Sequence, residues 1–369
     1  MAVKPVELIS EKEWLRYKRH LQLPGFDAKA QLAIKKASVL VIGAGGLGCP
    51  ILLYLAAAGI GRLGVVDYDV IEIENLHRQI LYSNADVGKS KAIVAGEKIK
   101  HLHPFVDIKI FNESIDFHNV ISILSSFDII VDGSDNFTTR YLLNDACVIL
   151  QKPYIYGAVF QFEGQVSSFN ILLKDGTRSC NYRNIYPEPP ALGVIPSCAE
   201  GGVIGILPAI IGSVQALEVI KLVTGLGDML VNITWIFDAL SMESQRIKIL
   251  NKKPVEIKEI IPIQNYCIPN QVREIDLEEA KKVYQSDYLL IDVRTEEERK
   301  VSHIGGIHLP LNCIREQFHL ITESRKTLIF YCQSGKRSKE AVQLTQQISE
   351  GRINCLSLRG GLNNQIDLG

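Results

Sequence analysis

Residues 38–48 read SVLVIGAGGLG, an apolar run that passes directly into a glycine-rich loop. The apolar half is typical of a buried strand, and the alanine-rich stretch that follows the loop, as far as Ala58, predicts a helix. Gly43, Gly45 and Gly48 form the pattern G-x-G-x-x-G between them. Glycine lets the backbone turn tightly and lets a phosphate approach the N–H groups at the start of the helix. The stretch therefore predicts a loop that binds a nucleotide.

Strand and helix patterns alternate beyond this loop. Apolar runs end at Asp67, Phe111 and Val131, and residues 88–101 read as a helix. This alternation predicts an α/β fold, in which helices cover both faces of a Rossmann-like parallel sheet. After Pro153 two alternating runs, YIYGAV and QVSSF, are separated by a turn that contains glycine. These runs predict an antiparallel hairpin.

The chain length and one irregular segment predict two domains. A chain of 369 residues is long enough for two or three domains of ordinary size. Residues 251–270 mix charges with three prolines and lack periodicity, so we predict a linker there. Residues 1–250 then form the nucleotide-binding domain, and residues 271–369 form a second, smaller α/β domain.

The composition excludes several classes of protein. The 40 basic residues almost balance the 41 acidic ones, which argues against a nucleic-acid partner. The first twenty residues carry eight charges, so they do not resemble an export signal. The most apolar stretch, from Gly201 to Leu217, is shorter than a typical membrane span. Eight cysteines occur without a Cys-x-x-Cys pair, which suits a reducing compartment. We therefore expect a cytoplasmic protein with no membrane partner.

Charged residues near the predicted strand ends indicate which nucleotide binds. Asp67 lies nineteen residues after Gly48, where a carboxylate accepts hydrogen bonds from ribose hydroxyls. Arg78 and Lys91 supply two cations, and Asp135 supplies a carboxylate for Mg²⁺. This set favours ATP with Mg²⁺ over a dinucleotide. Two alternatives stay open: a nicotinamide-dependent oxidoreductase fused to a thiosulfate sulfurtransferase, and a scaffold without catalytic activity.

A second loop carries a cysteine at the end of the apolar run TLIFY. Cys332 opens the sequence CQSGKRS, and a helix is predicted from Ser338. The start of a helix and nearby cations favour a thiolate over a thiol, and Gly335 lets the loop curl around an anion. The predicted persulfide-binding loop consists of Cys332, Gln333, Ser334, Gly335, Lys336 and Arg337.

The motifs of the first domain resemble those of the HesA/MoeB/ThiF family. They are RYKRH at 16–20, GAGGLGC, VVDYD, NLHRQ, VGKSK, DGSDN, and PSCAEGGVIG around Cys198, and they occur in the order typical of the family. Members of this family are adenylyltransferases of the ubiquitin-activating type that work on sulfur-carrier proteins. The resemblance covers roughly residues 7–250 and implies a Rossmann-like domain that uses ATP.

The resemblance also implies roles for individual residues. Arg19 would reach into the active site of a partner subunit, which implies a homodimer. Cys198 matches the cysteine of the family that accepts an acyl group or forms a disulfide. The residues that would hold ATP and its metal are Gly46, Asp67, Asn75, Arg78, Lys91, Asp135 and Asn136.

The second domain resembles a rhodanese, a sulfurtransferase fold, over about residues 275–362. IDVRTEEER and SHIGGIHLPL match two upstream signatures, in which Asp292 and Arg294 would have structural roles. The spacing Cys-x4-Arg, one residue shorter than in related phosphatases, favours a persulfide over a phosphate.

One departure from the first family concerns zinc. Many relatives hold a structural zinc on two Cys-x-x-Cys pairs. In this chain Asn181 and Asn184 stand at the positions of one pair, and Cys180 is one residue out of register. The second pair is absent, since only Cys267 remains. Because a closed zinc site needs four ligands, we expect no zinc.

Together the two halves predict one reaction sequence. ATP would activate the C-terminal glycine of a ubiquitin-like sulfur carrier with a Gly-Gly tail, and a persulfide on Cys332 would then give a thiocarboxylate. Thiosulfate or a cysteine desulfurase would supply the sulfur. The predicted catalytic residues are Arg19, Arg78, Lys91, Asp135, Cys198 and Cys332. The sequence leaves open the carrier and its pathway, among molybdopterin, thiamine, transfer-RNA thiolation, cysteine and natural products.

Overall fold

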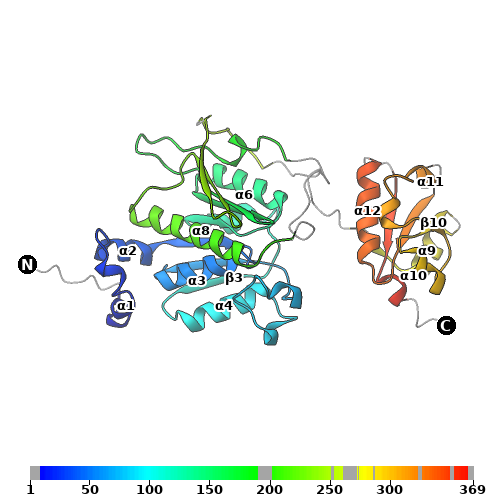
Figure 1. The fold of residues 1–369 in the computed structure, drawn as a ribbon, viewed down its shortest axis with the longest axis horizontal. Coiled ribbons are helices and arrows are strands. Elements are labelled where there is room, and N and C mark those ends of the chain that lie inside the picture. The colour runs from blue at the N-terminus through cyan, green and yellow to red at the C-terminus, as the bar shows by residue number, and fades with distance from the viewer. Residues whose placement is uncertain are drawn as a thin grey trace, which may run out of the picture. The chain divides into compact units, whose positions relative to one another are not determined.

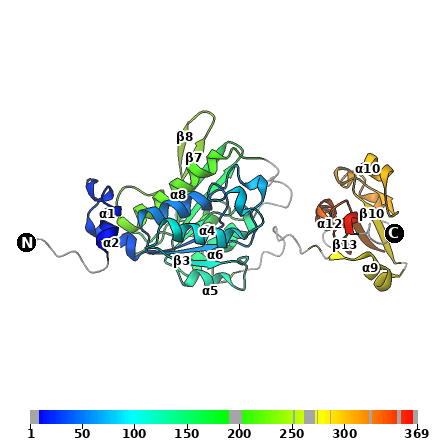
Figure 2. The same ribbon diagram turned by 90° about the horizontal axis from the view of Figure 1, so that it is seen from below.

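The computed structural model divides into two compact units, Met1–Tyr266 and Cys267–Gly369, each with its own sheet (Figures 1 and 2). It describes residues 9–189, 202–250, 253–260, 272, 274–285, 287–322, 326–349 and 353–364. The predicted α/β fold is confirmed: a Rossmann-type sheet comes first, and a five-stranded parallel sheet follows.

The sheet of the first unit has the order β3-β2-β1-β4-β5-β6-β7-β8. Strands β1 to β5 run parallel, and β6 to β8 continue the sheet in antiparallel fashion. The hairpin predicted after Pro153 is therefore β5–β6. The strands are β1 Ser38–Ile42, β2 Arg62–Val66, β3 Asp107–Phe111, β4 Ile129–Asp132, β5 Tyr154–Phe160, β6 Glu163–Phe169, β7 Ile233–Asp238 and β8 Ser244–Lys248.

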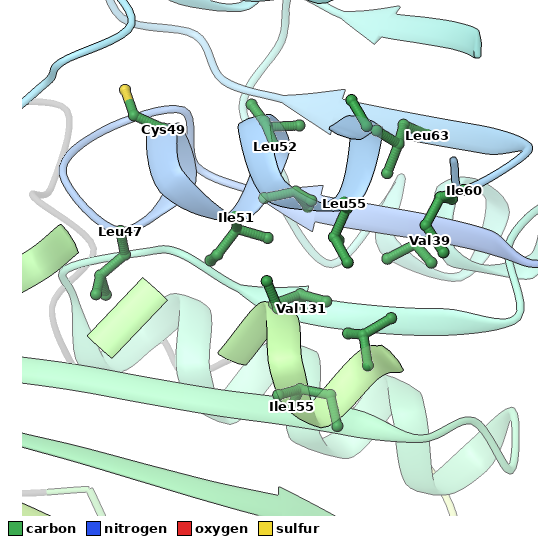
Figure 3. Close-up of a cluster of buried hydrophobic side chains, with 14 of the residues drawn as sticks. Val39, Leu47, Cys49, Ile51, Leu52, Leu55, Ile60, Leu63, Val131 and Ile155 are labelled. Atoms are coloured by element: carbon green, nitrogen blue, oxygen red, sulfur yellow. The ribbon is translucent and has the colours of Figure 1, made fainter. Parts of the chain in front are cut away.

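Helices cover both faces of this sheet because successive strand residues point to opposite sides. Val39 and Val41 join the core beneath α2, α3, α4 and α8, part of which Figure 3 shows. Leu40 and Ile42 join the core beneath α5 and α6. The helices are α1 Glu11–Arg16, α2 Ala28–Lys36, α3 Gly48–Ala58, α4 Lys91–Leu102, α5 Val120–Ser125, α6 Phe137–Ile149 and α8 Ile206–Thr224.

Helix α8 corrects one expectation. The helix continues past Leu217, through the charged residues Glu218 and Lys221, and its 19 residues are by length and composition alone enough to cross a membrane. It instead packs on α3, β5 and β6 inside the first unit. Its polar residues Gln215 and Glu218 are buried there: Gln215 donates a hydrogen bond to the carbonyl oxygen of Asp132, and Glu218 accepts one from the hydroxyl of Ser168. Helix α8 is therefore a core helix.

The second unit has a five-stranded parallel sheet in the order β11-β10-β12-β13-β9. One face of the sheet packs under α11 and α12, and the other packs under α9. The helix predicted from Ser338 begins two residues earlier, because the carbonyl of Gly335 already accepts a hydrogen bond from the amide of Lys339. The elements are β9 Glu274–Ile275, α9 Leu277–Tyr284, β10 Tyr288–Asp292, α10 Glu296–Val301, β11 Ile307–His308, α11 His319–Thr322, β12 Thr327–Tyr331, α12 Lys336–Ile348 and β13 Cys355–Leu358.

Candidate active sites of the two units

The glycine-rich loop joins the end of β1 to the start of α3. Gly43 has a φ of +89°, and a Cβ atom there would lie 2.7 Å from the carbonyl oxygen of Gly133. A Cβ atom on Gly48 would lie 1.9 Å from the carbonyl oxygen of Gly43. Both positions therefore require glycine for this path of the backbone. The loop is fixed further by Asp67, whose carboxylate accepts a hydrogen bond of 2.7 Å from the amide of Ala44.

The loop borders an open cleft, whose empty space together with the solvent at its mouth is about 1090 Å³. The cleft lies at the carboxyl ends of the parallel strands, the usual place for a ligand in such a sheet. The structure brings together here most of the nucleotide-binding residues predicted from the sequence. Those that line the cleft are Gly43, Gly45, Gly46, Asp67, Arg78, Lys91, Asp135 and Asn136.

The charged groups of the cleft are partly engaged with one another. The Nζ atom of Lys91 lies 2.8 Å from a carboxylate oxygen of Asp69, a partner that the sequence analysis did not single out. Burial raises the pKa of Asp67, and the hydrogen bonds from the amides of Ala44 and Asp69 oppose that shift. Arg78 donates a hydrogen bond of 3.1 Å to the carbonyl oxygen of Glu74. A phosphate group in the cleft would therefore meet two cations held near the loop.

Three predicted residues are not among those that line the cleft. Gly48 lies behind the loop at the start of α3. Asn75 is buried, and its side chain accepts a hydrogen bond from the amide of Glu72, so it caps the short helix Ile73–Asn75. Arg19 is exposed on the surface and donates a hydrogen bond to Gln22. In this chain Gly48 and Asn75 shape the backbone beside the cleft.

Cys198, the predicted acyl-accepting or disulfide-forming residue, lies outside the described residues. The structure therefore says nothing about its surroundings.

Two buried polar residues of the cleft were missed by the sequence analysis. Gln79 and Arg140 line it and are 4% and 5% exposed. The Oε1 atom of Gln79 and the Nε atom of Arg140 have no hydrogen-bond partner within the described part of the chain. The sequence carried a weak signal for both: Gln79 ends the quoted motif NLHRQ, and Arg140 lies one helical turn after Asn136.

In the second unit Cys332 lies where β12 passes into α12. Its side chain is buried, and the amide of Gly335 donates a hydrogen bond to the Sγ atom at 3.2 Å. The Oγ atom of Ser338 lies 3.7 Å from the same sulfur. Gly335 has a φ of +87°, a conformation that glycine adopts without strain. The loop therefore directs an N–H group and the start of a helix toward the sulfur.

The guanidinium group of Arg337, close to this sulfur in the sequence, pairs with a carboxylate. It makes two hydrogen bonds to the carboxylate of Glu298, at 2.6 and 2.7 Å. This contact lowers the pKa of Glu298 to about 2. Lys336 is exposed. Arg337 is thus paired with Glu298 and also interacts electrostatically with Cys332. The amide of Gly335 is the donor that meets the sulfur.

A buried ion pair contacts the loop that carries Cys332. Arg294 and Asp292 are 1% and 0% exposed and lie 2.8 Å apart. Arg294 also donates a hydrogen bond of 3.3 Å to the side chain of Gln333, which in turn donates one of 2.7 Å to Asn363. Gln333, the residue after the cysteine, is thereby tied to the rest of the unit.

An amide pair occupies the positions that the resemblance assigned to zinc ligands. The side chain of Asn181 donates a hydrogen bond to the carbonyl oxygen of Val255, and that of Asn184 donates one to the carbonyl oxygen of Lys253. The Oδ1 atom of Asn184 also accepts a hydrogen bond from the amide of Asn181. Within the described residues, no group of three or more His, Cys, Asp or Glu side chains could hold a metal ion.

Comparison with known proteins decides the family. The model of the ThiF family matches residues 17–257, more than half of the chain. The chain belongs to the ThiF family. The model of the rhodanese-like domain matches residues 276–365. The resemblance of both halves, drawn from the motifs, is thereby confirmed.

Relatives join both activities in one chain. The probable adenylyltransferase/sulfurtransferase MoeZ of Mycobacterium tuberculosis is 40% identical over 381 residues, which cover 98% of this chain and 94% of that protein. The adenylyltransferase and sulfurtransferase MOCS3 of Xenopus laevis is 35% identical and covers 96% and 86%. This chain is accordingly an adenylyltransferase and sulfurtransferase of the ThiF family, and the oxidoreductase and scaffold alternatives are set aside.

Solved structures support the fold of the first unit. Escherichia coli MccB has a TM-score of 0.59 at 21% sequence identity, covering 71% of this chain and 77% of that one. PaaA has a TM-score of 0.57 at 22% identity, covering 68% and 78%. At this level of identity the likeness concerns the fold.

Proposed function

We propose that this enzyme adenylates the C-terminal glycine of a ubiquitin-like sulfur-carrier protein and then converts it into a thiocarboxylate. The observation that carries the proposal is a cleft that unites the glycine loop with Arg78, Lys91 and Asp135, in a chain that also holds Cys332 at the start of a helix. The name of a relative supports the substrate: the sulfur carrier protein adenylyltransferase of Thermus thermophilus is 45% identical over 240 residues, which cover 65% of this chain and 89% of that protein.

In the first step a carboxylate oxygen of the tail attacks the α-phosphorus of ATP, and pyrophosphate leaves. The carboxylate itself is a poor acyl donor, and the adenylate gives it a good leaving group. Arg78 and Lys91 offset the negative charge that develops on the departing phosphates. The amide groups of the glycine loop hold the phosphates at the start of α3.

Asp135 and Asn136 fit a magnesium ion bound together with the nucleotide. Asp135 offers carboxylate oxygens in the same cleft as the phosphate-binding loop. Asn136 offers an amide oxygen that also accepts a hydrogen bond of 2.8 Å from the amide of Thr139 at the start of α6. Mg²⁺ is commonly held by one or two carboxylates together with substrate phosphates and water, so a single carboxylate is sufficient. When bound, the ion would neutralise part of the charge on the phosphates.

In the second step the outer sulfur of a persulfide on Cys332 attacks the acyl-adenylate carbonyl, and AMP leaves. The thiolate of Cys198, to which we assign this step, then attacks the Sγ atom of Cys332 in the resulting acyl disulfide, so the thiocarboxylate leaves and a disulfide forms between Cys198 and Cys332. An external thiol must reduce this disulfide before the next cycle. Thiosulfate or a cysteine desulfurase would load the sulfur onto Cys332.

The remaining expectations belong to the same proposal. The enzyme would act as a cytoplasmic homodimer in which Arg19 reaches the partner's site, without a nucleic-acid or membrane partner. A relative from Porphyra purpurea named probable molybdopterin-synthase adenylyltransferase, 36% identical over 372 residues, favours the molybdopterin pathway.

We further propose that no structural zinc is needed. The hydrogen bonds of Asn181 and Asn184 to residues 253–255 support this view. They already connect the two chain segments that a zinc ion at these positions would join. Metal analysis that finds one tightly bound zinc ion per chain would contradict it.

The test is ATP–pyrophosphate exchange dependent on a carrier that ends in Gly-Gly. We expect Asp135→Ala to abolish exchange and Cys332→Ala to retain it while thiocarboxylate formation is lost. Asp128→Ala, an exposed carboxylate just before β4, serves as the control and should leave both activities unchanged. Loss of exchange in Cys332→Ala as well would show that the two roles are assigned wrongly.

A further inference from the structure

A buried cation lies in the wall of the cleft without a hydrogen-bond or ion-pair partner among the described residues. Arg140 lies on α6, four residues after Asn136, and is 5% exposed. It lines the cleft, and its Nε atom is buried without a hydrogen-bond partner. Among the described residues, none accepts a hydrogen bond from its guanidinium group or forms an ion pair with it. Burying such a group without partners is costly, so its place in the wall requires an explanation.

The groups around Arg140 fix its position without using its donors. The Cζ atom lies 5.2 Å from the centre of the Phe137 ring and 5.7 Å from that of Tyr156. These ring contacts hold the cation, but an aromatic face does not replace a hydrogen-bond acceptor in the guanidinium plane. The N–H groups of Arg140 therefore stay available to a ligand.

The buried carboxylate of Asp132 does not fill that role. Its Oδ1 atom accepts hydrogen bonds from the amide and hydroxyl groups of Ser134, and its Oδ2 atom accepts one from the hydroxyl of Tyr154. Asp132 offsets the charge of Arg140 through space while its oxygens are used elsewhere. An anion that enters the cleft would supply the acceptors that Arg140 lacks, in the bidentate geometry that guanidinium prefers.

The order of strands separates Arg140 from Lys91, a cation suited to the triphosphate. Asp67 and Lys91 follow β2, and the glycine loop follows β1, whereas Arg140 lies on the helix that follows β4, one turn beyond the proposed magnesium ligand Asp135. In the sheet order β2-β1-β4-β5, Arg140 therefore lies across the glycine loop from Asp67 and Lys91. The cations among the described residues that line the cleft are Arg78, Lys91 and Arg140. With the loop, Arg78 and Lys91 assigned to the triphosphate, Arg140 remains for the second anionic reactant.

We propose that Arg140 binds the C-terminal carboxylate of the substrate protein and so positions it for attack on the nucleotide. The inference rests on the proposed function, because it presumes a carboxylate substrate. The ligand of Arg140 would be the free main-chain carboxylate at the end of a glycine tail. A neutral end group of the same shape would not satisfy the guanidinium.

The experiment compares two forms of one carrier protein, with a free C-terminal carboxylate or a C-terminal amide. The carrier is one that supports ATP–pyrophosphate exchange by the unaltered enzyme, and binding is measured without nucleotide. We expect the carboxylate form to bind the unaltered enzyme roughly 10- to 100-fold more tightly than the amide form. Arg140→Met should remove this preference by weakening the carboxylate form alone, and Arg140→Lys should keep part of it.

The matched control is Arg62→Met. Arg62 also lies over an aromatic ring, 4.9 Å from the centre of Phe127, but it is not among the residues that line the cleft. This variant should keep the full preference for the carboxylate. Affinity for ATP and the unfolding temperature should change little in Arg140→Lys, which separates a binding role from a purely structural one.

Several results would overturn the proposal. Equal binding of both carrier forms by the unaltered enzyme would do so, as would an equal loss for both forms in the Arg140 variants. Should Arg140→Met fail to fold, the comparison in the unaltered enzyme and in Arg140→Lys still decides. If no carrier ending in Gly-Gly supports exchange at all, the proposed function fails, and that outcome is distinct from a failure at Arg140.

Discussion

Two cysteines, each at the start of a helix that follows a parallel strand, differ in what their sulfur atoms do. Cys49 is the second residue of α3, and its Sγ atom donates a hydrogen bond of 3.4 Å to the carbonyl oxygen of Ala44. Cys332 precedes α12, and its Sγ atom accepts a hydrogen bond of 3.2 Å from the amide of Gly335. Both side chains are buried, at 0% and 1% exposed, so burial alone does not distinguish them.

The difference shows how the same strand–loop–helix unit can serve two kinds of acceptor. In the first unit the loop begins with glycine, and the amides of Gly43 and Ala44 donate to Val66 and Asp67. The next amides, of residues 45 and 46, have no acceptor among the described residues and are left for an outside ligand. Burial raises the pKa of Cys49 to about 12. In the second unit the loop begins with the cysteine itself, and the amide of Gly335 donates to its sulfur. Glycine at the first position of the loop therefore leaves room for an outside ligand, whereas cysteine supplies the accepting atom from the protein itself.

The largest expected effect comes from exchanging the two cysteines for alanine. Cys332→Ala should reduce thiocarboxylate formation by roughly 10³-fold or more, because the sulfur-carrying atom is lost. Cys49→Ala should leave sulfur transfer unchanged and lower the free energy of unfolding by about 1 kcal/mol, because a small buried side chain is truncated. Mass spectrometry of the carrier, together with urea denaturation, measures both. Equal loss of sulfur transfer in the two variants would contradict the assignment of sulfur transfer to Cys332 rather than Cys49.

The second test adds a Cβ atom to each loop. Gly48→Ala should lower ATP–pyrophosphate exchange by about 100-fold and destabilise the first unit by roughly 3 kcal/mol, since the new atom meets the carbonyl of Gly43 at 1.9 Å. In Gly335→Ala the new atom meets its first neighbour, the amide nitrogen of Gly360, at 3.4 Å. Gly335→Ala should therefore lower the free energy of unfolding of the second unit by about 1 kcal/mol, which is the cost of placing alanine at a positive φ. Thermal unfolding and exchange rates report the two effects, and a milder result for Gly48→Ala than for Gly335→Ala would contradict this view.

The smallest expected effect concerns the carboxylate that neutralises Arg337. The pKa of Glu298, about 2, lies below its ordinary value of 4.5 because of the hydrogen bonds from Arg337. The ionised form therefore stabilises the second unit above pH 4.5, and this contribution is lost as the pH falls from 4.5 toward 2. Since both side chains are 35% exposed, we expect about 1 kcal/mol. Denaturant unfolding at pH 6 and pH 3 should show that Glu298→Gln loses less stability than the unaltered chain.

Glu296→Gln is the matched control for that measurement. Glu296 pairs with Lys300 at 2.8 Å, but these side chains are 68% and 72% exposed. Solvent screens such a pair, so its removal should hardly change the dependence of stability on pH. An equal effect of the two substitutions would mean that the contact of Glu298 with Arg337 adds no more than a surface ion pair.

The sequence was sufficient for features that depend on neighbours along the chain. The glycine spacing from Gly43 to Gly48 and the placement of Cys332 after β12 follow from local pattern, whereas the helix predicted from residue 88 begins three residues later, at Lys91. Strand periodicity and loop glycines act within a few residues, and backbone conformation responds to them directly. The fold class and the family could therefore be predicted, and most of the predicted nucleotide-binding residues do line the cleft.

Only the tertiary structure decided which charges are free and which are engaged. Arg337 meets Glu298 across 39 positions of sequence, and Lys91 meets Asp69 across 22. Asn75 belonged to a predicted binding motif but caps its own helix, whereas Arg140, which no motif marked as a ligand, lies in the wall of the cleft without a hydrogen-bond or ion-pair partner among the described residues. Hydrogen bonding and burial depend on segments that are distant in the sequence and meet only in the folded chain. Local sequence patterns therefore do not predict which of these residues will be in contact.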